Sequence, residues 1–145
     1  MSFHHTNFIK DIMRKPPIIV STNTSILEII HKMIFDKSDT VIVTSHEKGV
    51  GLITERDIIR YIDTKKTQFS LSITAEEIIM RPLITISKEA TILEADTLMK
   101  RNNIRHLAVV ENEDSKKIVG QIDFTNLHDH LLTGFANTLR EYNRY

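Results

Sequence analysis

Apolar residues recur at helical spacing in two stretches of the chain, which predicts two helices that each carry one apolar face. In the first stretch they fall at positions i, i+3, i+4 and i+7, namely Ile26, Ile29, Ile30 and Met33. The second stretch runs from Ile92 to Met99, and its face is weaker because Asp96 stands where the first has Ile30. A hydroxyl residue with a glutamate three positions later precedes each stretch, as in the capping box that starts many helices. The two pairs are Ser25 with Glu28 and Thr91 with Glu94.

Short runs rich in β-branched residues, which favour strands, surround both predicted helices. One such run precedes each helix and two follow it. The two that follow are predicted to form hairpins across residues 45–48 and 111–117, with Gly49 and the polar residues supplying the turn. A further helix is predicted after Thr54 from the helical spacing of Ile58, Ile59 and Ile62.

The chain repeats itself with a period of about 66 residues. The matched segments are Ile12-Met13-Arg14 with Ile79-Met80-Arg81, Pro16 with Pro82, 25–28 with 91–94, Met33 with Met99, 40–43 with 106–109, and 50–53 with 119–122. Each copy reads as a β-α-β-β-α unit, and a unit of about sixty residues buries too little apolar surface to be comfortable alone. We therefore expect two copies that pack sheet to sheet in an α/β (α+β) fold. The predicted boundaries are 8–63 for the first repeat, 64–72 for a polar connector, 73–133 for the second repeat and 134–145 for a helical tail.

Composition and charge exclude several classes of protein. Nineteen basic residues balance nineteen acidic ones, so no overall field draws the chain to nucleic acid or to an anionic membrane. Cysteine is absent, which excludes disulfides, thiolate nucleophiles and cysteine zinc sites. No apolar run approaches the roughly 18–20 residues of a membrane span, and the start MSFHHTNFIKD lacks the apolar core of a signal peptide. We expect a cytoplasmic protein with no membrane or nucleic-acid partner.

The sequence contains little that indicates a catalytic or metal-binding site. No nucleophile–base pair, P-loop or glycine-rich phosphate turn is apparent, so we expect no enzymatic activity. His4 and His5 precede the predicted fold, and His128 and His130 lie two positions apart on a predicted helix, where their side chains point in different directions. We therefore predict no metal site.

The combined motifs resemble the tandem cystathionine-β-synthase (CBS) domain pair, or Bateman module. They are the duplicated IM…P…(S/T)ILE opening, the strand IRHLAVV and the ending VGLITERDI, and the resemblance covers the chain from about Phe8 to Leu132. It implies two repeats packed around a pseudo-two-fold axis, with two clefts that each draw residues from both copies.

In that family the hydroxyl and the aspartate of a G-x-x-(T/S)-x-x-D ending bind the ribose of an adenosine nucleotide, which implies this role for Thr54 and Asp57. A carboxylate suits the role because it can accept hydrogen bonds from both ribose hydroxyls. The other residues that the resemblance assigns to this cleft are Leu83, Ile84 and Ile104 against the base, and Arg56, Arg105 and His106 toward the phosphates.

The second cleft departs from the family pattern. Asp123 replaces the hydroxyl and Asn126 replaces the ribose-binding aspartate, while Asp39-Thr40 stands where the first cleft has Arg105-His106. Each extra carboxylate would repel a phosphate by about 1 kcal/mol at a partly exposed site. We expect one competent cleft, with the second empty or holding an uncharged ligand.

The T-x-x-D pattern also has a purely structural interpretation, because it matches a helix start in which the hydroxyl caps and the acid answers. Asp123 can cap equally well, so the second repeat keeps the structural role and loses the ligand chemistry. The cap and the ligand role can coexist at Thr54 and Asp57, and Arg105 taken alone also fits a solvated surface arginine.

The function predicted from the sequence is a regulatory module that binds an adenosine nucleotide such as AMP, ADP or ATP and signals to an effector protein on another chain. The nucleotide is a regulatory ligand, and no cofactor is expected. The alternative is a structural or assembly protein with vestigial clefts. The final helix continues an apolar stripe at steps of four, Leu127, Leu131, Phe135 and Leu139, which either packs on its own domain or forms the seam of a homodimer, the state we expect.

Overall fold

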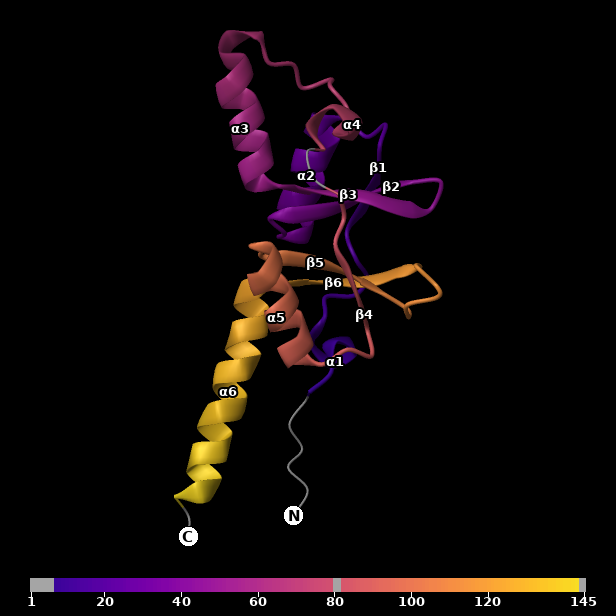
Figure 1. Cartoon of the computed structure of the whole chain (residues 1–145). Helices are drawn as coiled ribbons and strands as arrows, with labels where there is room; N and C mark the ends of the chain where they lie inside the picture. The colour runs from indigo at the N-terminus through magenta and orange to yellow at the C-terminus, as the bar shows by residue number, and fades with distance from the viewer. Residues whose placement is uncertain (1–6, 80–81, 144–145) are drawn as a thin grey trace. The chain divides into compact units, whose positions relative to one another are not determined.

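The computed structural model describes residues 7–79 and 82–143, and for residues 135–138 and 141–142 it describes the backbone alone. These residues form two compact units, each with a three-stranded sheet and helices, so the mixed α/β class predicted from the sequence is confirmed (Figure 1). His4, His5, Met80, Arg81 and the side chain of Phe135, which the sequence interpretation invoked, lie outside the described residues. No helix within the described part of the chain is long and apolar enough to cross a bilayer.

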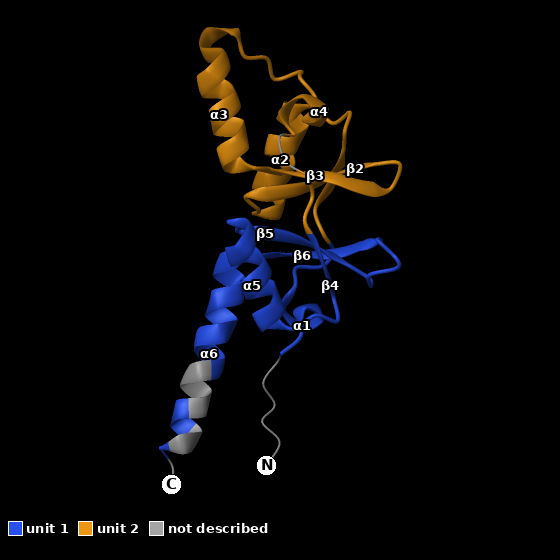
Figure 2. Cartoon of the chain, viewed as in Figure 1, with its two compact units in different colours: residues 1–16, 85–145 blue, residues 17–84 orange. Residues whose placement is uncertain are grey.

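One unit consists of residues 17–84 (Figure 2). Its elements are β1 (Ile19–Ser21), α2 (Ile26–Asp36), β2 (Thr40–Ser45), β3 (Lys48–Thr54), α3 (Glu55–Lys65), the 3-10 turn η1 (Lys66–Gln68) and α4 (Ala75–Ile78). The sheet order is β1-β2-β3, in which β1 and β2 are parallel and β2 and β3 are antiparallel.

The other unit consists of residues 1–16 and 85–145. Its elements are α1 (Ile9–Ile12), β4 (Thr85–Ser87), α5 (Ile92–Asn102), β5 (His106–Val110), β6 (Ile118–Asp123) and α6 (Phe124–Tyr142). The sheet order is β4-β5-β6, with the same parallel and antiparallel pairings as in the first unit.

The predicted helix starts are confirmed at α2 and α5. The Ser25 hydroxyl accepts a hydrogen bond from the backbone N–H of Glu28 at 3.2 Å. At α5 the capping box is reciprocal, because Thr91 Oγ1 accepts from Glu94 N at 3.1 Å and Glu94 Oε2 accepts from Thr91 N at 3.2 Å. The predicted apolar face of α2 is buried against the sheet, where Ile26 and Ile29 are fully inaccessible to solvent.

The hairpin between β2 and β3 lies at residues 45–48, as predicted, but Gly49 is not part of its turn. Its turn is His46–Glu47, and both residues have positive φ, at 50° and 66°. This is the backbone of a tight two-residue turn whose twist matches that of the strands. Gly49, which we expected to contribute to the turn, lies in β3 opposite Thr44, where the register shifts.

The compact units and the sequence repeats divide the chain differently. The first helix of repeat 1, α1, belongs to the unit that holds most of repeat 2, and the first helix of repeat 2, α4, belongs to the unit that holds most of repeat 1. Four equivalent backbone hydrogen bonds make these attachments: Ile9 N to Ala90 O (2.9 Å), Ile92 N to Asn7 O (2.8 Å), Ala75 N to Thr24 O (2.8 Å) and Ile26 N to Ile73 O (2.8 Å). The bounds of α4 lie 66 residues after those of α1, so the structural equivalent of Ile12 is Ile78 and not Ile79, with which the sequence repeat matched it.

The chain after α1 passes close to β6. The backbone of Arg14 exchanges two hydrogen bonds with that of Gln121, at 2.8 and 3.1 Å. A Cβ atom on the neighbouring Gly120 would lie 2.5 Å from Met13 Sδ and 3.0 Å from the Arg14 carbonyl oxygen. Glycine at position 120 therefore allows the leading segment to lie on the strand.

We predict that Gly120→Ala lowers the free energy of unfolding by about 1–3 kcal/mol, because the new methyl group overpacks the contact with Met13 and Arg14. Gly134→Ala is the matched control: it places the same methyl group in α6 with nothing within 4 Å. There the gain in helix propensity raises stability by up to about 1 kcal/mol. Urea denaturation of both variants measures the difference, and equal stability of the two would contradict the close approach.

Candidate functional site

Thr54 and Asp57 form a reciprocal capping box where β3 ends and α3 begins. Thr54 Oγ1 accepts a hydrogen bond from Asp57 N at 3.3 Å, and Asp57 Oδ2 accepts from Thr54 N at 2.9 Å. The Thr54 hydroxyl also lies 3.1 Å from Asp57 Oδ2, to which it donates. The structural interpretation of the T-x-x-D pattern is thus confirmed.

The capping box uses one oxygen of the Asp57 carboxylate and leaves the other available. All hydrogen bonds that the side chain accepts from described residues go to Oδ2, and Oδ1 accepts none. The side chain is half-buried, so the cap fixes its orientation while Oδ1 keeps two lone pairs for an outside donor. Such an acceptor suits a pair of neighbouring hydroxyl groups.

The equivalent junction between β6 and α6 uses different side chains. Asp123 Oδ1 accepts from Asn126 N at 2.8 Å, which confirms that Asp123 caps this helix. Asn126 Nδ2 donates to the carbonyl oxygen of Ile12 at 2.8 Å and so ties α1 to α6. A carboxylate could not make this bond because it has no hydrogen to donate. No sequence pattern indicates this role, since Ile12 and Asn126 are 114 residues apart.

The middle strand of each sheet starts beside the capped helix of its own unit. In residues 17–84, Thr40 pairs with Thr54 across the β2–β3 register. In the other unit, His106 pairs with Asp123 across the β5–β6 register. Arg105 and His106 thus lie next to Asp123 in one unit, and Thr54 lies next to Thr40 in the other. The grouping of Arg105 and His106 with Thr54 in one cleft stays a prediction.

The remaining predicted residues lie at accessible positions. Arg56 is exposed on the first turn of α3, while Leu83 and Ile84 are half-buried in the extended segment before β4. Ile104 is half-buried, and its N–H donates to Met99 O at 3.0 Å, next to the end of α5.

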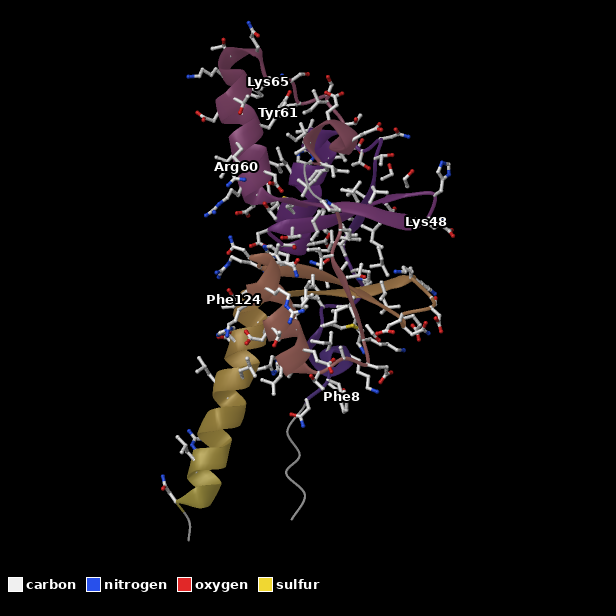
Figure 3. All side chains as sticks on the ribbon, in the orientation of Figure 1. Phe8, Lys48, Arg60, Tyr61, Lys65 and Phe124 are labelled. Carbon is white, nitrogen blue, oxygen red and sulfur yellow. The ribbon has the colours of Figure 1, made fainter. Side chains whose placement is uncertain are left out.

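Phe124 is the first residue of α6 (Figure 3). Arg105 is exposed and lies over the ring of Phe124, with its guanidinium carbon 4.6 Å from the ring centroid. The ring of Phe124 also contacts that of His128, with centroids 3.9 Å apart. His128 Nε2 in turn lies 3.2 Å from Asp96 Oδ1. The sequence interpretation missed this cluster because two of its contacts, Arg105 with Phe124 and His128 with Asp96, join residues that are distant along the chain.

Asp96 interrupts the apolar face of α5, and its carboxylate contacts two basic groups. Its Oδ2 lies 2.9 Å from Lys100 Nζ, one helical turn away. The hydrogen bond from Lys100, and to a smaller extent that from His128, lowers the pKa of Asp96 below its ordinary value, against the opposing effect of burial. The side chain is only 14% exposed, so these partners are needed to keep the charge in place.

No group of three or more His, Asp or Glu side chains that could hold a metal ion occurs among the residues that the structure describes.

The comparisons with known proteins agree on one family. The model of the CBS domain matches residues 9–64 and 75–133. L-aspartate semialdehyde sulfurtransferase of Methanocaldococcus jannaschii is 34% identical over 113 residues, which is 77% of this chain but only 21% of that protein. An uncharacterized protein of Methanopyrus kandleri is 26% identical over 139 residues, covering 92% of this chain and 69% of its own length.

Two solved structures resemble the chain over most of its length. A CBS domain protein from Pyrobaculum aerophilum complexed with AMP has a TM-score of 0.76 at 23% identity and covers 89% of this chain and 98% of its own, which supports the fold. The CBS domain pair of protein MJ0100, in complex with 5′-methylthioadenosine and S-adenosyl-L-methionine, has a TM-score of 0.75 at 29% identity. It covers 88% of this chain and 96% of its own.

Loss of either cap should cost stability. We predict that Thr54→Ala and Asp123→Ala each lower the free energy of unfolding by about 1 kcal/mol, because each leaves a helix-start N–H without its acceptor. Urea denaturation without any ligand measures both losses. A stability unchanged by Thr54→Ala would contradict the capping box at α3.

The ion pairs of Asp96 predict a pH dependence. A carboxylate whose pKa is lower in the folded state than its ordinary value of 3.8 stabilises the fold above that value, and this stabilisation is lost as the pH falls through the folded-state pKa. Asp96→Asn should therefore cost about 1 kcal/mol at pH 6 and less at pH 3.5. Asp129→Asn, at an exposed position of α6, is the control and should show no such trend. A cost of Asp96→Asn that is constant between the two pH values would contradict the ion pairs.

Proposed function

The chain belongs to the CBS domain family, and from this we propose that it is a regulatory module that binds an adenosine-containing ligand. The observation that carries the proposal is the Asp57 carboxylate, which the capping box holds by one oxygen while Oδ1 accepts no bond from a described residue. Support also comes from the domain pair of MJ0100, whose structure holds two adenosine derivatives.

In the proposed complex, Asp57 accepts hydrogen bonds from the ribose hydroxyls and Thr54 keeps the carboxylate in place. Hydrogen bonds to a charged acceptor are the stronger ones, each contributing about 1.5–3 kcal/mol. The adenine base lies against apolar surface from Leu83, Ile84 and Ile104. A phosphate-bearing ligand such as AMP, ADP or ATP is met by Arg105 and His106, with Arg56 assisting, and these assignments depend on the two units sharing a cleft.

We propose one such site in the chain. At the equivalent helix start, Asn126 is committed to the carbonyl oxygen of Ile12 and cannot offer a carboxylate to ribose. Asp39, directly before β2, accepts a hydrogen bond from the Thr40 hydroxyl and would repel a phosphate. The second site is therefore empty or takes an uncharged ligand.

The proposed output is a change in the chain's affinity for a partner protein, because a ligand can shift a conformational equilibrium only by binding one state more tightly than another. The sulfurtransferase activity of the M. jannaschii relative is not proposed for this chain, which matches 21% of that protein. A structural role with non-functional sites is the competing candidate, and the reciprocal caps alone would be compatible with it.

The proposal predicts a selective thermal shift. AMP, ATP, S-adenosylmethionine or 5′-methylthioadenosine at about a hundred times its dissociation constant should stabilise the protein by about 2.7 kcal/mol. Asp57→Asn should abolish the shift, because the amide can keep the cap through its oxygen but presents its NH2 group where the ribose needs an acceptor.

Asn126→Ala is the matched control for this experiment. It should lower the melting temperature of the free protein by removing the bond to Ile12, yet leave the ligand-induced increment unchanged. A protein that responds to none of these ligands favours the structural role. An increment lost in Asn126→Ala and kept in Asp57→Asn would contradict the assignment of the site.

A further inference from the structure

We propose that Phe124 is a positioning residue for Arg105, holding its guanidinium group ready to bind a phosphate, and that His128 and Asp96 hold the Phe124 ring in place. The four residues, which we call the Arg105 stack, all belong to the unit of residues 1–16 and 85–145. The inference extends the proposed function, in which Arg105 contacts the phosphate of the ligand.

The backbone fixes the position of the ring relative to the arginine. Phe124 N donates to the carbonyl oxygen of Arg105 at 2.8 Å, and the guanidinium carbon lies 4.6 Å from the ring centroid. Both distances involve the same two residues, so the side chain of Arg105 folds back over the ring beside its own backbone. An aromatic face within about 6 Å attracts a cation through its quadrupole.

The ring is held from α5. His128 follows Phe124 by one helical turn on α6, and the two rings lie 3.9 Å apart with planes tilted by 33°. His128 Nε2 contacts Asp96 Oδ1, and the other oxygen of Asp96 is bound to Lys100. These contacts limit the movement of the His128 side chain. His128 in turn limits the movement of the Phe124 ring, because it covers one side of that ring.

Stacking leaves the hydrogen-bonding capacity of Arg105 unused. A guanidinium group stacks through its flat face, while its five N–H donors point outward in the plane and match two oxygens of a phosphate. Arg105 is exposed, and its guanidinium group makes no hydrogen bond or ion pair with a described residue. The stack therefore restricts the arginine without satisfying it, which lowers the entropy lost when an anion binds.

The other unit has the same backbone contact without the stack. Glu55 N donates to the carbonyl oxygen of Asp39 at 2.9 Å, as Phe124 does to Arg105. In this unit Asp39 stands in the place of Arg105 and Glu55 in the place of Phe124. Ile59 stands in the place of His128. The stack is thus specific to one repeat and is not required by the fold.

The test uses Phe124→Leu in the full chain, with Phe8→Leu as the matched control. Phe8 carries a lysine, Lys10, 5.5 Å from its ring centroid, so the control removes a similar contact away from Arg105. The first measurement is the Arg105 Nε–Hε signal in NMR spectra during titration with inorganic phosphate. We expect phosphate to shift this signal, and Phe124→Leu to weaken the apparent affinity by about two- to five-fold, the loss of one exposed cation–π contact.

The second measurement compares AMP with adenosine by calorimetry. In Phe124→Leu the affinity for AMP should fall by the same factor while that for adenosine stays unchanged, and His128→Ala should give a smaller fall. Phe8→Leu should change neither ratio. A merely structural role of Phe124 would change both affinities together, and that result would overturn the inference.

The two proposals fail in different ways. Suppose that phosphate shifts the Arg105 NMR signal and Phe124→Leu weakens this response, while no adenosine compound binds. The positioning role of Phe124 is then supported and the proposed function is wrong. If the preference for AMP over adenosine is lost in Arg105→Ala but kept in Phe124→Leu, the proposed function stands and the positioning role is wrong.

Discussion

A helix that starts at the end of a strand must find acceptors for its first backbone N–H groups, and the candidate site depends on how this chain meets that requirement. At the start of α3 the acceptors are a hydroxyl and a carboxylate that hold each other. At the start of α6 a single carboxylate, Asp123, accepts one N–H. The same structural need is thus met twice, and at α3 the capping box leaves one half-buried oxygen of Asp57 unused.

The two repeats share a backbone plan and differ in the chemistry placed on it. Both have a parallel pair followed by an antiparallel hairpin, and both hold the start of the middle strand to the start of the following helix by one backbone hydrogen bond. On this common frame one repeat carries Asp39 and the other carries Arg105. Duplication preserves the frame, while each copy's polar side chains are free to take separate roles.

Features set by neighbours in sequence could be predicted. The apolar face of α2 follows from residue spacing, and the caps at Ser25, Thr91 and Thr54 follow from residues three positions apart. Features set by distant residues could not. From the sequence, Asn126 was interpreted as the loss of a ligand-binding aspartate. In the structure its side-chain amide donates to the carbonyl oxygen of Ile12, 114 positions earlier. The hairpin at residues 45–48 was predicted, but the positive φ was not: His46 and Glu47 adopt it, while Gly49, expected to supply the turn, lies in β3.

The central claim is that the free oxygen of Asp57 binds the ribose hydroxyls. The most direct test is calorimetric comparison of adenosine with 2′,3′-dideoxyadenosine in the wild-type protein and in Asp57→Asn. The account predicts that the wild type binds adenosine at least about ten-fold more tightly, as expected for hydrogen bonds to a charged acceptor, and that Asp57→Asn binds the two ligands equally. An unchanged preference for adenosine in Asp57→Asn would contradict it.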